Sequence, residues 1–185
     1  MKNYRVAVLA GILAVILCGR AFSAGRRVDV DFNEWDTAGD GQLSEQEFVH
    51  GFMQTDIFED WDRDGSLTLD EDEFAEGVFE AWDLDESGFL TMDEFEVGVR
   101  MYFEDYDPDV HGTFDEWDAE GDGVISFEEF RGNFIMTNLF EEWDLDGNGE
   151  VDRLEFAIML FRTWDRDDDG YLSREEFRQG MEASF

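Results

Sequence analysis

The sequence predicts an all-α fold, an array of helix–loop–helix units repeated along most of the chain. First, each of the six Trp residues has a Phe three positions before it and an Asp directly after it, and residues three apart share one face of a helix. Second, a Glu-Phe pair follows each of those Asp residues at one fixed distance. Third, a formal net charge of -36 is combined with 43% hydrophobic and 16% aromatic residues. Acidic disordered segments lack that apolar content, so a folded core is expected.

The charge also limits what the protein binds. Asp and Glu number 49, against 13 Lys and Arg. Proteins that bind DNA, RNA or anionic lipid headgroups neutralise phosphates with Lys and Arg. We therefore expect no nucleic-acid partner, no membrane contact beyond the N-terminal segment, and a cation as the natural ligand.

Residues 1–24 have the composition of a secretory signal peptide. Lys2 and Arg5 lead into an apolar run over residues 6–19, and small residues follow up to Ala24. The run is 14 residues long, whereas a membrane-spanning helix needs roughly 20. We expect an exported protein, secreted or periplasmic, with an N-terminally membrane-anchored form as the alternative. Cleavage near Ala24 removes Cys18, the only Cys, so neither a disulfide nor thiol catalysis is expected.

The rest of the chain repeats one motif six times: Phe-x-x-Trp-Asp, ten residues, then Glu-Phe. The interval from Asp to Glu, both included, is twelve residues in every copy. The Trp residues are Trp35, Trp61, Trp82, Trp117, Trp143 and Trp164. An apolar residue recurs at position 8 of each interval: Leu43, Leu69, Leu90, Ile125, Val151 and Leu172.

This interval resembles the calcium loop of EF-hand proteins, and the resemblance covers nearly all of residues 28–185. In that loop, positions 1, 3 and 5 supply side-chain oxygens, position 7 its backbone carbonyl, position 9 often a water-mediated contact, and position 12 a bidentate Glu. Position 6 is Gly, which allows a sharp turn. The resemblance implies Ca2+ as the bound ion, and short β-bridges around position 8 between paired loops. The loops are numbered 1 to 6 in chain order, and each loop with its two flanking helices is called a hand.

Loops 3, 4, 5 and 6 carry the complete pattern, at residues 83–94, 118–129, 144–155 and 165–176. Their candidate ligands are Asp83, Asp85, Ser87, Phe89, Thr91 and Glu94; Asp118, Glu120, Asp122, Val124, Ser126 and Glu129; Asp144, Asp146, Asn148, Glu150, Asp152 and Glu155; and Asp165, Asp167, Asp169, Tyr171, Ser173 and Glu176. Glu120, at position 3, is one methylene longer than Asp, so we expect a tuned but functional site in loop 4.

Loops 1 and 2, at residues 36–47 and 62–73, depart from the pattern. Their candidate ligands are Asp36, Asp40, Gln42, Ser44 and Glu47, and Asp62, Asp64, Ser66, Thr68, Asp70 and Glu73. Ala38 removes the oxygen of position 3 in loop 1. Leu67 occupies the Gly position of loop 2, where a positive φ costs a side-chain-bearing residue roughly 1–2 kcal/mol. We predict weaker metal binding in both loops.

The aromatic residues give each hand an apolar face that it cannot bury alone. Phe and Trp of the entering helix lie three apart, and a further Phe begins the exiting helix at position 13. We interpret these positions as helical core, with a target-binding surface as the alternative.

The loop spacing indicates a tandem duplication of a three-hand unit. Loops 1, 2 and 3 begin at residues 36, 62 and 83, and each start recurs 82 residues later. We expect a first half over residues 25–105 and a second half over residues 106–185, packed together as one globule. The only Pro of the chain, in Tyr106-Asp107-Pro108-Asp109, predicts a turn between them.

The linker lengths predict which loops pair. Loops 1 and 2 are separated by 14 residues and loops 2 and 3 by nine, and each length fits a single shared helix. Loops at opposite ends of one helix cannot pair, so we predict that loop 2 pairs with loop 5. The others pair either as 1 with 3 and 4 with 6, or as 3 with 4 and 1 with 6, and the sequence favours neither.

These features predict a secreted, non-enzymatic calcium-binding protein, a buffer or a calcium-stabilised module, with about four good sites and two degenerate ones. Two alternatives remain open. One is a calcium-dependent sensor or adaptor that docks a protein partner, and the other is a binder of other hard cations such as lanthanides. His50 and His111 are the only histidines, and no catalytic constellation or phosphate-binding loop accompanies them. We also expect the metal-free chain to be expanded or partly molten.

Overall fold

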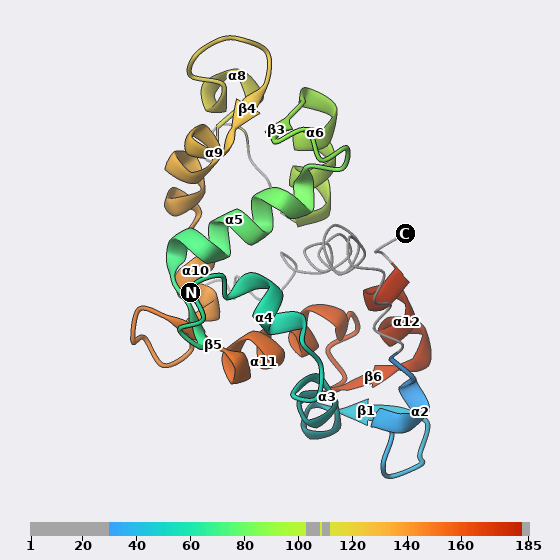
Figure 1. Cartoon of the computed structure of the whole chain (residues 1–185). Helices are drawn as coiled ribbons and strands as arrows, with labels where there is room; N and C mark the ends of the chain where they lie inside the picture. Colours follow the sequence, from blue (N-terminus) through green and yellow to red (C-terminus); the bar gives the residue numbers. More distant parts are fainter. Residues whose placement is uncertain (1–29, 103–107, 109–111, 183–185) are drawn as a thin grey trace, which may run out of the picture.

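The computed structural model describes residues 30–102, 108 and 112–182, and their fold is all-α with short paired strands (Figure 1). The helices are α2 (Phe32–Trp35), α3 (Glu45–Phe52), α4 (Ile57–Trp61), α5 (Glu71–Trp82), α6 (Met92–Tyr102), α8 (Phe114–Trp117), α9 (Phe127–Phe134), α10 (Leu139–Trp143), α11 (Arg153–Trp164) and α12 (Arg174–Glu182), with a 3-10 turn η1 (Ile135–Thr137). The strands are β1 (Gln42–Ser44), β2 (Thr68–Leu69), β3 (Phe89–Leu90), β4 (Ile125–Ser126), β5 (Val151–Asp152) and β6 (Tyr171–Ser173). The predicted helix–loop–helix array is confirmed.

Each twelve-residue loop sets the helix ends on either side of it. The entering helices α2, α4, α5, α8, α10 and α11 all end at the Trp before the loop, so the first Asp of the loop is their C-cap. Position 9 is the N-cap of the exiting helix. In α3, α5, α9 and α11 it forms a reciprocal capping box with the Glu of position 12. The candidate ligands are therefore also the residues that terminate and start the helices.

The strand pairing joins residues 30–102 to residues 112–182 at three places (Figure 1). Strand β2 pairs antiparallel with β5, so the predicted pairing of loop 2 with loop 5 is confirmed. Of the two alternatives left open, the structure has loop 3 with loop 4 through β3 and β4, and loop 1 with loop 6 through β1 and β6. In all three pairs the position-8 residues face each other directly: Leu43 and Leu172, Leu69 and Val151, and Leu90 and Ile125.

The segment between loops 1 and 2 differs from the prediction. One shared helix over residues 48–61 is wrong: α3 ends at Phe52, residues 53–56 form a turn, and α4 begins at Ile57. Phe52 and Trp61 are both buried, yet nine residues apart on a straight helix they would lie on opposite sides. The break lets both side chains reach the core, and the Thr55 hydroxyl supports it by donating to the Phe52 carbonyl at 2.7 Å.

The second half breaks at the corresponding place, where η1 and Asn138, at φ 57°, separate α9 from α10. Between loops 2 and 3, by contrast, the single helix α5 confirms the prediction. Its buried Phe74, Val78 and Trp82 are four residues apart and therefore share one face.

The aromatic positions form the core, as predicted. The Phe and Trp of every entering helix and the Phe at position 13 are at most 9% exposed. Each Trp contacts the position-13 Phe of the paired hand with ring centroids 5.1–5.4 Å apart: Trp35 with Phe177, Trp164 with Phe48, Trp61 with Phe156, Trp143 with Phe74, Trp82 with Phe130, and Trp117 with Phe95. Each hand thus buries its partner's apolar face, so the packing is reciprocal.

Four exiting helices carry a Gly that the packing of Trp requires. A Cβ on Gly51, Gly77, Gly98 or Gly180 would lie 2.1–2.4 Å from an indole carbon of the Trp in the same hand. The backbone of the exiting helix therefore lies directly against the indole, at a position where no side chain fits.

Three expectations lie outside the described residues. They are the signal segment over residues 1–24, the turn at Tyr106-Asp107-Pro108-Asp109 apart from Pro108, and the position of His111. His50 lies exposed on α3. In the described part of the chain, no helix has the length and apolar character needed to cross a membrane.

Candidate metal sites

The first Asp of each loop organises the turn around it. One carboxylate oxygen accepts a hydrogen bond from the backbone N–H of position 6 at 2.7–2.9 Å. The other oxygen accepts from the N–H of position 5 at 2.9–3.2 Å. All six loops share these contacts, so each loop wraps around the carboxylate of its own first residue. Loops 1 and 2 form the turn in the same way despite their sequence departures.

The Glu at position 12 closes each loop. Its Oε2 accepts from the backbone N–H of position 9 at 2.8–3.3 Å. Its Oε1 accepts from the backbone N–H of position 2, of position 3 or of both, at 2.9–3.3 Å. The carboxylate therefore lies between the start and the end of the loop, where both of its oxygens can serve a cation.

Carboxylates from positions 1, 3 and 12 converge in loops 2, 3, 5 and 6. In each group the ligand atoms lie within 4.8 Å of one another. The four groups are Asp62, Asp64 and Glu73; Asp83, Asp85 and Glu94; Asp144, Asp146 and Glu155; and Asp165, Asp167 and Glu176. The position-3 carboxylate is held inward by accepting from the N–H of position 5 at 2.8–3.3 Å.

Loops 1 and 4 are not among these converging groups within the described residues. Loop 1 has Ala38 at position 3, which offers no side-chain oxygen. Loop 4 has Glu120 there, whose extra methylene lengthens the ring that a carboxylate forms with the amide two residues on. Asp118 and Glu129 still make their loop contacts. Loop 4 therefore keeps the hydrogen bonds of Asp118 and Glu129, but the carboxylate of Glu120 does not join theirs in a converging group.

The remaining candidate ligands lie on the same loops. Position 5 offers a side-chain oxygen from Asp40, Ser66, Ser87, Asp122, Asn148 or Asp169. Position 7 offers the backbone carbonyl of Gln42, Thr68, Phe89, Val124, Glu150 or Tyr171. Position 9 is Ser44, Asp70, Thr91, Ser126, Asp152 or Ser173. The donor sets are all oxygen, which suits a hard divalent cation such as Ca2+.

Comparison with known families agrees with this geometry. A family model described as EF hand matches residues 74–99, 110–135 and 135–160, and one described as EF-hand domain matches residues 157–185. Together these segments span more than half of the chain and contain loops 3 to 6. The chain belongs to the EF-hand superfamily. A search of curated proteins finds no match to it.

The EF-hand matches and the converging carboxylates indicate a divalent metal, typically Ca2+. Electrostatics in the loops favour such an ion. Burial raises the pKa of Asp83, and the charge of Glu94 and a hydrogen bond with Asp85 raise it further, against the amides of Gly88 and Ser87. A nearby cation stabilises the ionised form of such a carboxylate more than that of an isolated one. Protons compete with the cation for the same oxygens.

In loop 6 of this EF-hand protein, burial and neighbouring carboxylates likewise oppose ionisation of the first Asp. Burial raises the pKa of Asp165, and the charges of Asp169 and Glu176 add to that effect. In loop 1 the amides of Ser44 and Ala38 instead lower the pKa of Glu47 to about 2. That carboxylate stays anionic because backbone dipoles already stabilise it.

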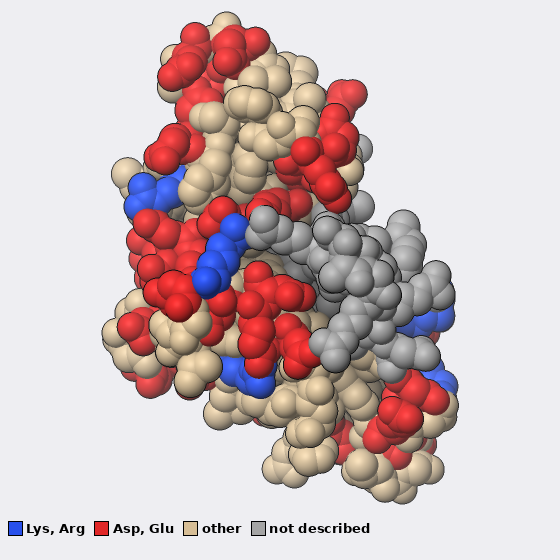
Figure 2. All heavy atoms as spheres, viewed as in Figure 1, with Lys and Arg blue, Asp and Glu red and all other residues tan. Residues whose placement is uncertain are grey.

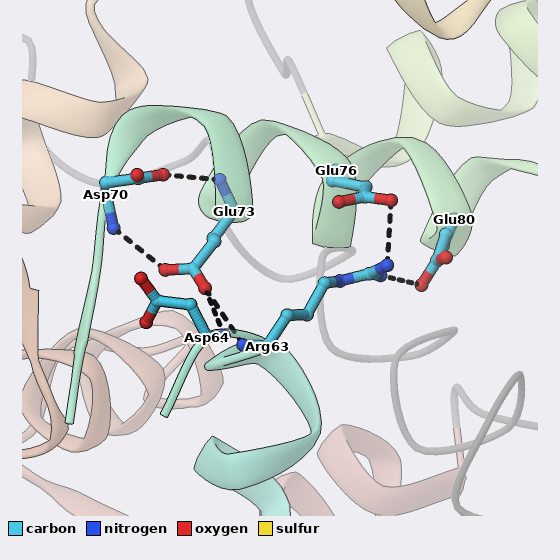
Figure 3. A network of polar contacts seen from close by, with 6 residues as sticks. All are labelled: Arg63, Asp64, Asp70, Glu73, Glu76 and Glu80. Atoms are coloured by element: carbon cyan, nitrogen blue, oxygen red, sulfur yellow. Dashed lines mark hydrogen bonds and ion pairs between the residues drawn. The ribbon is translucent and has the colours of Figure 1, made fainter. Parts of the chain in front are cut away.

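In loop 2 of the EF-hand array, the backbone is strained at Leu67, and the cationic side chain of Arg63 lies nearby. Leu67 adopts φ 74° at the Gly position, and the residue is 72% exposed. Figure 3 shows Arg63, at position 2, reaching along α5 to Glu76 and Glu80, with both N–O distances 2.7 Å. These ion pairs tie the start of loop 2 to its own exiting helix.

Replacing Leu67 with Gly should stabilise the protein by about 1 kcal/mol. Removing the strain of Leu67 in the left-handed region raises the free energy of unfolding by roughly 1–2 kcal/mol. The greater freedom of Gly in the unfolded chain lowers it by about 0.4–1 kcal/mol. Thermal unfolding in excess calcium measures the change. Leu67→Ala keeps the Cβ and is the matched control, for which no gain is expected; equal gains in both variants would contradict the strain argument.

The ligand pattern left three groups of residues unrecognised. The glycines under the Trp rings could have been found, because Gly recurs four residues after the position-12 Glu in four of six hands. Arg63 and the basic residues at position 10 of loops 5 and 6 carry no such periodic signal. Their roles depend on contacts with other segments.

Proposed function

We propose that this EF-hand protein is an exported calcium-binding protein that acts as a buffer or as a calcium-stabilised module. The observation that carries the proposal is the convergence of three carboxylates within 4.8 Å in loops 2, 3, 5 and 6. We take these four loops as the primary sites. Loops 1 and 4 are weaker, because position 3 lacks an oxygen in one and carries the longer Glu120 in the other.

The buried aromatic faces support a buffer or a module over a sensor. Calcium sensors open to expose a Met-rich groove. Here the Trp and Phe positions are already reciprocally packed between paired hands. Acidic side chains are spread over the visible face of the molecule, with few basic ones among them (Figure 2). Such a surface attracts cations over a long range and keeps the chain soluble.

Export is supported by the composition of residues 1–24. Extracellular modules of this kind bind calcium with dissociation constants near 10⁻⁴–10⁻³ M. A protein exported to a calcium-rich compartment therefore needs no high-affinity sites. In that setting calcium acts as a structural component, and the protein needs no catalytic group.

The proposal is tested by a calorimetric calcium titration of residues 25–185 with magnesium present. Four or more sites near millimolar affinity support a buffer or module. Sites at micromolar affinity or tighter, with calcium-dependent binding of a hydrophobic dye, would instead favour the sensor. A competing terbium titration tests the lanthanide alternative, which requires terbium to bind far more tightly than the extra charge alone explains.

Glu155→Gln should remove one site from that titration. Glu155 is 6% exposed, and its two carboxylate oxygens accept from the backbone amides of Asp146 and Asp152 at 2.9 Å each. Loss of the charge at position 12 should weaken loop 5 at least about 100-fold, or about 2.8 kcal/mol. Glu150→Gln is the matched control: it makes the same charge change in the same loop, at a position that offers only its carbonyl. If both variants lose the site equally, position 12 has no special role.

Glu120→Asp should strengthen loop 4. The shorter side chain can accept from the amide of Asp122, as Asp85 does from Ser87 at 3.0 Å in the paired loop 3. We expect roughly a tenfold gain in affinity, about 1.4 kcal/mol. Calorimetry measures it, with Glu128→Asp as the control on the outer face of the same hand. Unchanged binding would mean that the length of Glu120 is not what limits loop 4.

A further inference from the structure

Position 10 of each second-half loop packs on the entering helix of the paired first-half hand. In all three pairs the residue it meets is the Phe three positions before the Trp. The three contacts are Phe127 on Phe79, with centroids 5.5 Å apart, Arg153 on Phe58, with Cζ 5.6 Å from the ring centroid, and Arg174 on Phe32, with Cζ 4.3 Å from the centroid. One loop position is therefore used repeatedly to contact the partner hand.

The two arginines also bind the polar residue that follows that Phe. Arg153 forms an ion pair with Glu59 on α4. Arg174 Nη2 donates to Asn33 Oδ1 on α2 at 2.6 Å. Each guanidinium thus meets two features at once, the negative face of an aromatic ring and an oxygen acceptor beside it. Hands 2 and 1 offer a surface complementary to a cation.

The first-half hands carry no cation at position 10. Their residues there are Glu45, Glu71 and Met92. If hand 2 paired with hand 2 of a second copy, Glu71 would take the place of Arg153 and set an anion against Glu59 and the Phe58 ring. If hand 1 paired with hand 3, as the spacing also allows, Met92 would replace Arg174 and leave Asn33 without its charged donor.

We propose that Arg153 and Arg174 specify the partners of hands 2 and 1, so that the first half accepts second-half hands and rejects copies of itself. The partner recognised is a hand with Arg at loop position 10. The arginines are positioning residues, because they act on strand pairing and touch no candidate ligand of the first half. This role is independent of whether the protein serves as a buffer, a module or a sensor.

A charge-swap cycle in the full chain tests the ion pair. Arg153→Glu and Glu59→Arg should each lower the folding equilibrium constant in excess calcium. In the double variant the folding equilibrium constant should be at least about fivefold higher than the two single effects predict when added as free energies. The reason is that the double variant restores the ion pair with its charges exchanged. Arg153→Gln gives a milder loss and is used where Arg153→Glu fails to fold.

A control cycle separates this contact from the overall charge. Arg162 lies exposed on the same helix, α11, and its guanidinium contacts Met159 at 3.8 Å. Arg162→Glu combined with Glu59→Arg makes the same charge changes without the contact, so the two effects should simply add. Equal coupling in both cycles would overturn the proposal, because it would trace the effect to net charge alone.

Hydrogen exchange provides a readout specific to each loop pair. Arg153→Gln should speed exchange at Leu69 and Val151 of the β2–β5 pair at least about tenfold more than at Leu90 and Ile125 of the β3–β4 pair. Arg174→Met should do so at Leu43 and Leu172 of the β1–β6 pair. Uniform changes over all three pairs would show that the arginines add general stability without directing pairing, and no change in any pair would show that they do neither. Either result would overturn the proposal.

Discussion

Chelating calcium should abolish most of the helical circular dichroism of this protein and expand it. The entering helices α2, α4, α8 and α10 are only four or five residues long, far below the length at which helices are stable alone. In all four, the C-cap is the first Asp of a loop. Without a cation, that Asp and its neighbouring carboxylates repel one another within a chain of net charge -36.

The magnitudes predict that bound calcium supplies a large share of the free energy that keeps the protein folded. A site of about 1 mM affinity in about 10 mM calcium adds about 1.4 kcal/mol to stability, so four such sites add about 6 kcal/mol. Whole domains are stable by only about 5–15 kcal/mol. Far-UV circular dichroism and the hydrodynamic radius, measured in calcium and after chelation, test the prediction.

High salt is the matched control for chelation. About 1 M sodium chloride shortens the Debye length to about 3 Å, so it should partly compact the chelated chain if repulsion is the cause. The same helix content and radius with calcium and with chelator would contradict the prediction. In that case the aromatic core alone would hold the fold.

Replacing Gly77 with Ala should be among the most destabilising single changes, at about 3 kcal/mol or more. A Cβ there would lie 2.4 Å from Trp61 Cε3, and Trp61 is 4% exposed between the paired hands. Overpacking of this kind costs typically 1–3 kcal/mol, and more where neither side can move. The indole cannot move away, because it also contacts Phe156 with centroids 5.1 Å apart.

Gly132→Ala is the control for that substitution. Gly132 also lies in an exiting helix, α9, but a Cβ added there would have nothing within 4 Å of it. Ala is a better helix former than Gly by about 1 kcal/mol, so this variant should gain stability. Chemical denaturation in excess calcium gives both values. A loss at Gly132 equal to that at Gly77 would trace the effect to glycine in general.

Much of the fold could be predicted from the sequence because it depends on local spacing. The positions of the six loops, their helix-ending Asp and capping Glu, and the buried Trp and Phe all follow from residues within one repeat. The pairing of loop 2 with loop 5 was predicted from the linker lengths, and α5 is the one shared helix on which that prediction relied that the structure confirms. The break between α3 and α4 did not follow, since 14 residues fit one helix by length and only the directions of Phe52 and Trp61 require two.

Residue type predicted only in part which carboxylates converge in the folded loops. Loop 2 contains Leu67 at the Gly position, yet its three carboxylates converge. Loop 4 offers a side-chain oxygen at positions 1, 3, 5 and 12, with the longer Glu120 at position 3, and within the described residues it is not among the converging groups. The ligand pattern specifies which oxygens are available, and the folded loop specifies which of them meet.

By itself, the sequence determined the positions of six acidic twelve-residue loops and of the aromatic residues beside them, which a single hand cannot bury alone. Only the tertiary structure decided that loop 1 meets loop 6 and loop 3 meets loop 4. Both arrangements satisfy the same linker lengths and the same apolar pattern. Contacts between distant residues distinguish them, such as that of Arg174 with Phe32 and Asn33, and no local propensity encodes such contacts.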